Sequence, residues 1–247
     1  QLKCLAGFNY KMIIEQNIEW INTSLMRMWD LGFKEKMAFF WTNHFVTELE
    51  DYRMPSWMYE YHTILQTHAL GNFKQMTLEI GRTPAMLIYL NGVQNTRFEP
   101  NENYARELFE LFTLGVDNGY TQNDIAETAR CLTGFNGFTE AGAPIGFIPS
   151  LHDSGSKTIF GQTGNFDYED LHDLLFEERA EEVASFICGK LFTFFIGKEV
   201  NQDIVGGLST IFINNNFDIA PVVSTLLKST FFFDQKQIGT KISSPVE

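Results

Sequence analysis

The fold class follows from the segment Pro100-Asn101-Glu102-Asn103-Tyr104-Ala105-Arg106-Glu107-Leu108-Phe109-Glu110-Leu111-Phe112-Thr113-Leu114-Gly115. Its apolar residues recur at intervals of three and four, which is the spacing of an amphipathic helix. Glycine is common just beyond the last turn of a helix, because it adopts positive φ without strain. The segment therefore predicts a helix over 101–114 that ends at Gly115.

The same periodicity predicts helices along most of the chain, separated by glycine, proline and capping residues. Thr121 followed three residues later by Asp124 is a helix-start signal, and that helix stops at Gly134. The other expected helices cover 10–29, 34–49, 55–70, 72–82, 84–91, 167–176, 178–195, 202–214 and 218–230.

The stretch from 136 to 163 differs, because glycine and turn-forming residues interrupt it. Two short apolar runs, 146–148 and 158–160, are expected to pair as a hairpin across a turn at 152–156. The expected fold is thus mainly α: a single multi-helix domain over 1–247 with a small β-hairpin insertion around residues 136–163. The sequence ends at 239–247 without a convincing terminator, so we expect the domain to be truncated there.

Composition excludes several classes of protein. The 247 residues carry a formal charge of −13, and nucleic-acid binding needs a basic surface. No run of 18 or more apolar residues is present, so no transmembrane segment is expected. Three cysteines, odd in number and far apart, do not indicate a disulfide framework. A globular, acidic protein is the expectation.

The first candidate site is a polar stripe on the 101–114 helix. At about 100° per residue, Asn103, Arg106, Glu107 and Glu110 fall on one side, close to Asn101 at the helix start. The stripe is either an ordinary solvated face with Arg106 neutralised by nearby acids, or a buried site whose carboxylates bind a cation or orient a ligand. We take Asn101, Asn103 and Arg106 as candidate ligand-binding residues, and Glu107 and Glu110 as candidate catalytic carboxylates.

The second candidate lies in Trp41-Thr42-Asn43-His44-Phe45-Val46-Thr47-Glu48. His44 falls on the apolar side of its expected helix, and Glu48 would lie one turn further on. His44 is either a core residue with satisfied hydrogen bonds or a catalytic group. With Glu48 it is also a candidate ligand for a divalent metal, although a metal site needs further ligands from elsewhere. Asn43 is a candidate ligand-binding residue.

The third candidate is His152-Asp153 in the glycine-rich stretch. Loops often carry functional residues, but aspartate in such a loop also serves to shape the turn. His62, His68 and His172 are expected at helix surfaces or ends. The chain contains no zinc-protease, phosphate-loop, dinucleotide-binding or serine-hydrolase motif.

Several ordered blocks together resemble the DUF1800 family of bacterial proteins, a family without an established activity. The blocks are Trp41 to Phe45, His68 to Phe73, Pro84 to Leu87, Pro100 to Gly115, Tyr120 to Phe135, His152-Asp153 with Lys157-Thr158, Gly164 to Asp167, and Lys241 to Glu247. One position departs from the family pattern, since Thr42 replaces the first histidine of Trp-His-Asn-His-Phe. If those two imidazoles held a metal, this chain would lack one ligand.

The resemblance implies that the domain is truncated at both ends. It also implies an extracytoplasmic protein, periplasmic or extracellular, that works with a partner of the DUF1501 family. We therefore expect an exported binding or assembly module. One alternative is an enzyme, a hydrolase or metal-assisted catalyst, in which His44 meets Glu107, Glu110, His152 or Asp153 in one cleft. Another is a carbohydrate-binding or surface-attachment protein.

Overall fold

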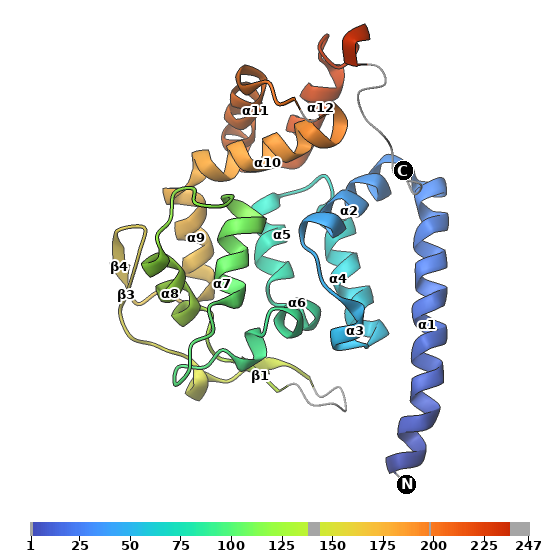
Figure 1. Cartoon of the computed structure of the whole chain (residues 1–247), viewed down its shortest axis with the longest axis vertical. Coiled ribbons are helices and arrows are strands. Elements are labelled where there is room, and N and C mark those ends of the chain that lie inside the picture. The colour runs from blue at the N-terminus through green and yellow to red at the C-terminus, as the bar shows by residue number, and fades with distance from the viewer. Residues whose placement is uncertain (1, 138–143, 198, 238–247) are drawn as a thin grey trace.

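The computed structural model describes residues 2–137, 144–197 and 199–237, and the described chain is mainly α-helical (Figure 1). The α-helices are α1 (Leu2–Leu31), α2 (Phe33–His44), α3 (Leu49–Tyr52), α4 (Pro55–His68), α5 (Phe73–Ile80), α6 (Pro84–Tyr89), α7 (Asn103–Glu107), α8 (Gln122–Cys131), α9 (Tyr168–Glu178), α10 (Ala180–Phe195), α11 (Gln202–Asn214) and α12 (Ile219–Lys228). Most of them match the helices that the periodicity predicts.

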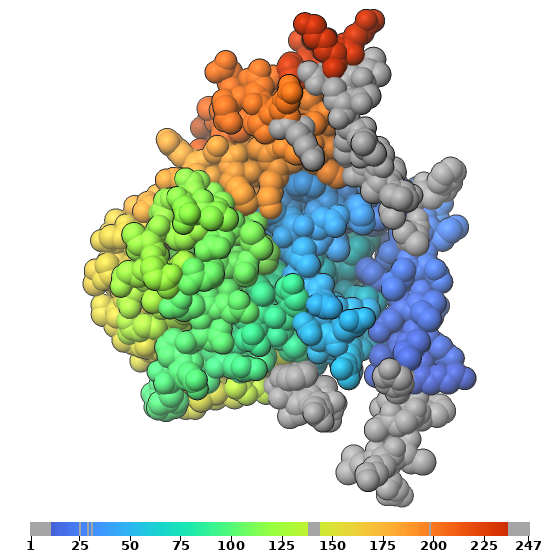
Figure 2. Space-filling view, viewed as in Figure 1, coloured from blue at the N-terminus to red at the C-terminus, as the bar shows by residue number. Residues whose placement is uncertain are grey.

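Helix α1 lies along one side of the molecule, next to α2 and α4 (Figures 1 and 2). Trp20 packs edge-on against the His62 ring of α4, and Arg27 forms an ion pair with Glu35 of α2. The side chains of Ile18 and Ile21 remain about half exposed, so α1 covers the core only in part. No helix in the described ranges combines the length and hydropathy needed to cross a membrane.

Within the described residues the strands form two antiparallel pairs, and the predicted pairing of 146–148 with 158–160 is wrong. β1 (Phe135–Asn136) pairs with β2 (Gly146–Phe147), and β3 (Lys157–Ile159) pairs with β4 (Gln162–Gly164). Phe160 and Gly161, the two residues between β3 and β4, both have positive φ. That backbone is the one expected of a two-residue hairpin turn, so β3 pairs with its immediate neighbour.

The prediction of one helix over 34–49 is wrong in its last turn. Helix α2 ends at His44, and Phe45 leaves the helical region with φ −95° and ψ 60°. Phe45 turns its side chain into the core, and its carbonyl accepts a hydrogen bond from the Tyr61 hydroxyl. Glu48 instead precedes the short helix α3, so it does not lie one helical turn beyond His44.

The structure also differs from the regular α-helix predicted over 101–114. Helix α7 begins at Asn103, and its continuation η2 (Leu108–Thr113) is π-helical. The Thr113 hydroxyl donates to the Leu108 carbonyl and the Leu114 N–H to the Phe109 carbonyl, both across five residues. Gly115 follows with φ +94°, as expected just beyond a helix end.

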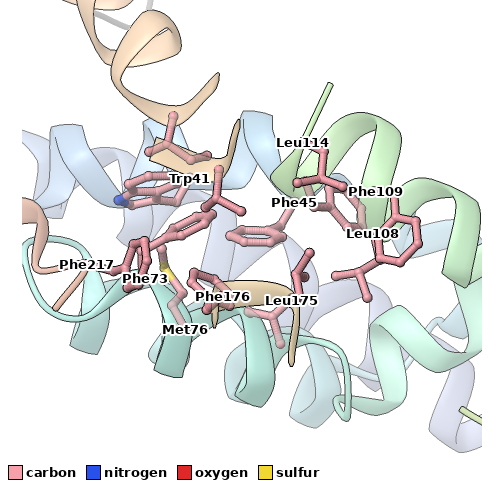
Figure 3. Close-up of a cluster of buried hydrophobic side chains, with 14 of the residues drawn as sticks. Trp41, Phe45, Phe73, Met76, Leu108, Phe109, Leu114, Leu175, Phe176 and Phe217 are labelled. Carbon is pink, nitrogen blue, oxygen red and sulfur yellow. The ribbon is translucent and has the colours of Figure 1, made fainter. Parts of the chain in front are cut away.

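Helices α2, α5, α9 and α11 meet in a continuous core of aromatic and aliphatic side chains (Figure 3). Phe73 of α5 is fully buried, with its ring centroid 5.4 Å from that of Trp41 and 6.0 Å from that of Phe45. The Trp41 indole N–H donates to the Ala69 carbonyl at 3.0 Å, which satisfies the only polar atom of that side chain. This core fixes the end of α2, where His44 lies.

Two histidines expected at helix surfaces are buried. His172 of α9 is fully buried and its Nδ1–H donates to the Tyr168 carbonyl at 2.8 Å. His62 of α4 is 7% exposed and lies 3.8 Å from the Glu35 carboxylate. Both positions face neighbouring helices, which the local sequence pattern does not show.

Candidate functional site

A cavity of about 570 Å³ opens where the end of α2 meets α10 and the start of α11. The blue segment that contains α2 and the orange segment that contains α10 adjoin in Figure 2. The surface of the cavity is mainly apolar, although polar side chains also line it. The lining residues are Phe40, Asn43, His44, Ser185, Phe186, Gly189, Lys190, Thr193, Phe194, Val200, Gln202 and Val205.

His44 is a buried, neutral imidazole with both ring nitrogens occupied. Its Nε2 lies 2.9 Å from the Phe112 carbonyl oxygen, and its Nδ1 lies 3.0 Å from Lys190 Nζ. A carbonyl only accepts, so Nε2 carries the proton and Nδ1 accepts from the lysine. Burial holds the pKa of His44 well below its usual value, the Lys190 charge lowers it further, and the bond to Phe112 opposes both.

Lys190, on α10, supplies the charge in this cavity. Its Nζ donates to His44 Nδ1 and, at 3.2 Å, to the Leu111 carbonyl, and it lies 4.7 Å from the centre of the Phe186 ring. Burial lowers the pKa of Lys190 to about 8. Among the described residues, no carboxylate forms an ion pair with Lys190. The lysine is therefore a half-buried cation without a counter-ion.

The end of η2 explains why these two side chains meet. The last carbonyls of a helix have no partner within it, and they carry the negative end of the helix dipole. The carbonyls of Leu111 and Phe112 are such groups, and they accept from Lys190 and His44 respectively. At Gly115 a Cβ would lie 3.0 Å from the Phe186 ring, so glycine lets η2 end close to α10. The end of η2 thus fixes the positions of the His44 and Lys190 side chains, which line the cavity.

The other residues proposed from the segment around His44 divide between the cavity and the surface. Asn43 lines the cavity, with its Nδ2 donating to the Phe39 carbonyl one turn back. Glu48 is exposed and is not among the lining residues. Both ring nitrogens of His44 are already hydrogen-bonded, so a His44–Glu48 metal pair would require breaking one of those bonds.

The polar stripe of α7 forms a separate network near the surface. Arg106 donates to Glu102 at 3.0 Å, to Glu110 at 3.3 Å and to Gln122 of α8 at 3.0 Å. Gln122 in turn donates to Glu102 at 2.7 Å. The arginine is neutralised by its neighbours and connects α7 to α8.

Glu107 differs from the other acids of the stripe. Its Oε2 is buried and has no hydrogen-bond partner among the described residues. Burial raises the pKa of Glu107, the neighbouring Glu110 charge raises it further, and Arg106 opposes the shift. Neither Glu107 nor Glu110 lines the cavity that contains His44.

The asparagines at the start of α7 shape the backbone. Asn101 Oδ1 accepts from the Asn103 N–H at 3.0 Å, which turns the chain into the helix. The Asn101 N–H donates to the buried Asn95 side chain, and Asn95 donates to the Ala129 carbonyl at the end of α8. The side-chain oxygens of Asn95 and Asn101 therefore shape the loop, whereas Asn103 contributes its backbone N–H.

His152 and Asp153 form a third, separate cluster against the end of α8. Asp153 accepts two bonds from Arg130, at 2.7 and 3.3 Å, and this arginine lowers the pKa of the Asp153 carboxyl. His152 Nδ1–H donates to the Thr133 carbonyl at 3.0 Å, and the Thr133 hydroxyl accepts from the Asp153 N–H. These contacts hold the loop between β2 and β3 on α8, away from His44.

Arg130 supports this loop, and removing it should be measurable. Arg130→Met leaves Asp153, Glu127 and the Ser156 carbonyl without its donors. We expect the free energy of unfolding to fall by about 1–2 kcal/mol, because these charge-assisted bonds are only partly screened by solvent. Urea denaturation measures the change. An equal loss from Arg97→Met, whose guanidinium packs on the exposed Phe98 ring, would contradict this reason.

The predicted site residues therefore occupy three places, and the structure brings only His44 and Asn43 into the cavity. In the described ranges, no group of three or more histidine, cysteine, aspartate or glutamate side chains is arranged to hold a metal ion. Lys190 was missed because a lysine on a helix is normally a surface residue. One sequence signal was available: the positions three and four residues away carry Phe186, Ile187, Thr193 and Phe194, and none is acidic.

Comparison with known proteins gives one match. Residues 9–247 match the model of the family described as "Protein of unknown function (DUF1800)". Neither the curated proteins nor the solved structures include a significant match to the chain. Because the family match covers almost every residue, from α1 through the cavity-forming helices to the last residue, the chain belongs to the DUF1800 family.

Proposed function

We propose that this chain is a binding module that works with a partner protein, and that the cavity between α2, α10 and α11 receives the bound group. The observation that carries the proposal is the composition of this cavity. Apolar side chains such as Phe40, Phe186 and Val205 supply most of its surface, and hydrogen bonds hold the polar groups of His44 and Lys190 in place. A mainly apolar cavity of several hundred Å³ with few convergent polar groups is typical of binding sites.

The identity of the partner and its location rest on the family resemblance. A DUF1501-type protein outside the cytoplasm is the partner that we propose on that basis. An acidic chain of net charge −13 suits a partner with basic surface regions.

The geometry favours binding over the enzyme alternative. General acid–base catalysis by His44 would need a carboxylate to orient the ring and a pKa near neutrality. Lys190 instead occupies Nδ1, and the pKa of His44 is well below its usual value. Glu107, Glu110 and Asp153 lie outside the cavity lining.

Gly189 offers a direct test, because a Cβ at this position meets no atom within 4 Å and the residue lines the cavity. Gly189→Leu should fill part of the cavity and weaken partner binding at least tenfold. The measurement is the Kd for a purified DUF1501 protein from the same genome, by calorimetry. Equal affinities of the wild-type chain and the leucine variant would overturn the proposal.

Gly189→Ala is the matched control. It adds only one methyl group, and it replaces glycine inside α10 by the best helix-forming residue. We expect unchanged partner binding and a free energy of unfolding higher by about 0.5–1 kcal/mol. Thermal unfolding of both variants separates an effect on the cavity from an effect on the fold.

A further inference from the structure

We infer that the group bound in this cavity is an apolar monocarboxylate, with its carboxylate on the Lys190 ammonium and its apolar part between the phenylalanine rings. The inference rests on the proposed function, since it takes the cavity as the binding site. It adds the chemical class of the ligand and the residue that recognises it.

The hydrogen bonds of Lys190 leave one donor free. An ammonium group has three N–H donors, and those of Lys190 have two acceptors, His44 Nδ1 and the Leu111 carbonyl oxygen. In the described part of the chain no nitrogen or oxygen atom accepts from the third, and a further contact of Nζ is with the Phe186 ring, whose centre lies 4.7 Å away. Because Lys190 lines the cavity, an incoming oxygen atom can reach this donor.

The charge of the site indicates an anion. A half-buried cation is costly unless an opposite charge accompanies it. The two acceptors of Lys190 are neutral, and no carboxylate is among the described residues that line the cavity, although the sequence has 31 acidic residues against 18 basic ones. A bound anion would form an ion pair with the Lys190 ammonium.

The amount of charge indicates a single carboxylate rather than a phosphate. His44 is neutral with both nitrogens occupied, so it adds neither a second positive charge nor a free donor. Phosphate recognition commonly uses several donors, arginine forks or helix N-termini. No arginine is among the described residues that line this cavity. Lys190 is the only cationic residue among those described lining residues, and its single charge matches a monoanion.

The walls of the cavity indicate an apolar tail. Phe40, Phe186 and Phe194 line it together with Val200 and Val205. A volume of about 570 Å³ far exceeds what a carboxylate alone would occupy. The ligand is therefore either a free aliphatic or aryl acid, or the C-terminal apolar residue of a polypeptide, which offers the same chemistry.

The test compares ligands that share a tail and differ in the head group. Octanoate, octanol and octylammonium are titrated by calorimetry into the wild-type chain, Lys190→Met and Lys190→Arg. Octanoate should bind at least tenfold more tightly than octanol, and octylammonium more weakly than either. Lys190→Met should lose this preference, and Lys190→Arg should retain part of it because the charge remains.

Lys34→Met is the matched control, since it removes the same charge from an exposed position on α2. It should leave octanoate binding unchanged. Thermal unfolding of each variant confirms that the fold is intact. Two peptides ending in phenylalanine, one with a free carboxylate and one amidated, distinguish the sources. A preference for the free-acid peptide over octanoate identifies a polypeptide C-terminus, and the reverse identifies a free acid.

The pH dependence gives a second readout. A carboxylate on Lys190 favours the ammonium form, so binding should take up a proton at pH values above about 8. Octanoate affinity should therefore fall as the pH rises above 8, whereas octanol affinity stays constant. Equal binding of octanoate and octanol, or an unaffected Lys190→Met, would overturn the carboxylate inference. The proposed function would survive that result, since it depends on the Gly189 variants.

Discussion

Replacing Phe73 by alanine is expected to lower the free energy of unfolding by about 3–5 kcal/mol, the cost of deleting a large, fully buried aromatic side chain. The ring of Phe73 lies at the first turn of α5 and is not exposed. Its centroid is 5.4 Å from that of Trp41, 6.0 Å from those of Phe45 and Phe176, and 6.1 Å from that of Phe212. Alanine would leave a cavity where four helical segments and the turn after α2 meet.

Chemical denaturation, with the slope of the transition compared between variants, measures this loss. Phe98→Ala is the control, because the Phe98 side chain is 74% exposed and its removal should change stability by less than about 0.5 kcal/mol. A loss below about 1 kcal/mol for Phe73→Ala would mean that its neighbours can collapse into the vacated space. The aromatic packing shown in Figure 3 would then contribute little to the free energy of unfolding.

Acid should destabilise this protein through its buried histidines, and His172 illustrates the effect. Burial lowers the pKa of His172 to about 4. Below pH 6.5 the unfolded chain therefore binds a proton at this residue that the folded chain does not. The free energy of unfolding consequently falls with decreasing pH, by about 3 kcal/mol between pH 7.5 and pH 4 for this residue alone. His44 acts in the same direction, because its pKa is also lowered.

The carboxylates of the protein also make its stability depend on pH. Comparing the wild type with His172→Leu separates the effect of His172 from theirs. Leucine keeps an apolar side chain in the buried position and cannot titrate. The hydrogen bond that it removes is to the Tyr168 carbonyl, four residues earlier in the same helix. We expect stability measured from pH 7.5 to pH 4 to fall less steeply in the variant. An identical pH dependence of the two proteins would show that His172 titrates normally, and hence that it is not buried.

The burial of Lys190 in the cavity lowers the stability of the fold, and a role in binding would explain why a lysine is present there. Lys190 lies in an apolar helix and lacks a carboxylate partner, and burial lowers its pKa to about 8. A lysine at such a position costs folding free energy, and the cost is relieved as the pH rises from about 8 towards the pKa of an unfolded lysine. Residues whose environment is unfavourable for folding are frequent at binding sites. This is the physical reason to connect Lys190 with a ligand.

The sequence determined the helical architecture because helix signals are local. The capping pair Thr121 and Asp124 forms the predicted capping box, with both reciprocal hydrogen bonds present. Gly115 ends its helix as expected, and the pattern from 167 onward corresponds closely to α9 through α12. Each of these features depends on bonds and side-chain contacts within about four residues, which a single sequence displays directly.

Local patterns were insufficient where a distant segment changes the backbone. The helix expected over 34–49 ends at His44 because Phe45 packs against rings from other helices. The 101–114 helix changes to a π-helix, and a count of 100° per residue then no longer places side chains correctly. The predicted stripe does not meet His44, since Arg106 forms its bonds with its own acids and with Gln122.

Only the tertiary structure decided the site. His44 and Lys190 are 146 residues apart, and their contact depends on how α10 packs against α2 and the end of η2. A sequence shows which residues can be buried, but not which buried polar groups will share a cavity, because that depends on the packing of every helix between them. The chain thus specified its helices by local hydrogen bonding, and packing between distant helices produced the half-buried cation and its cavity.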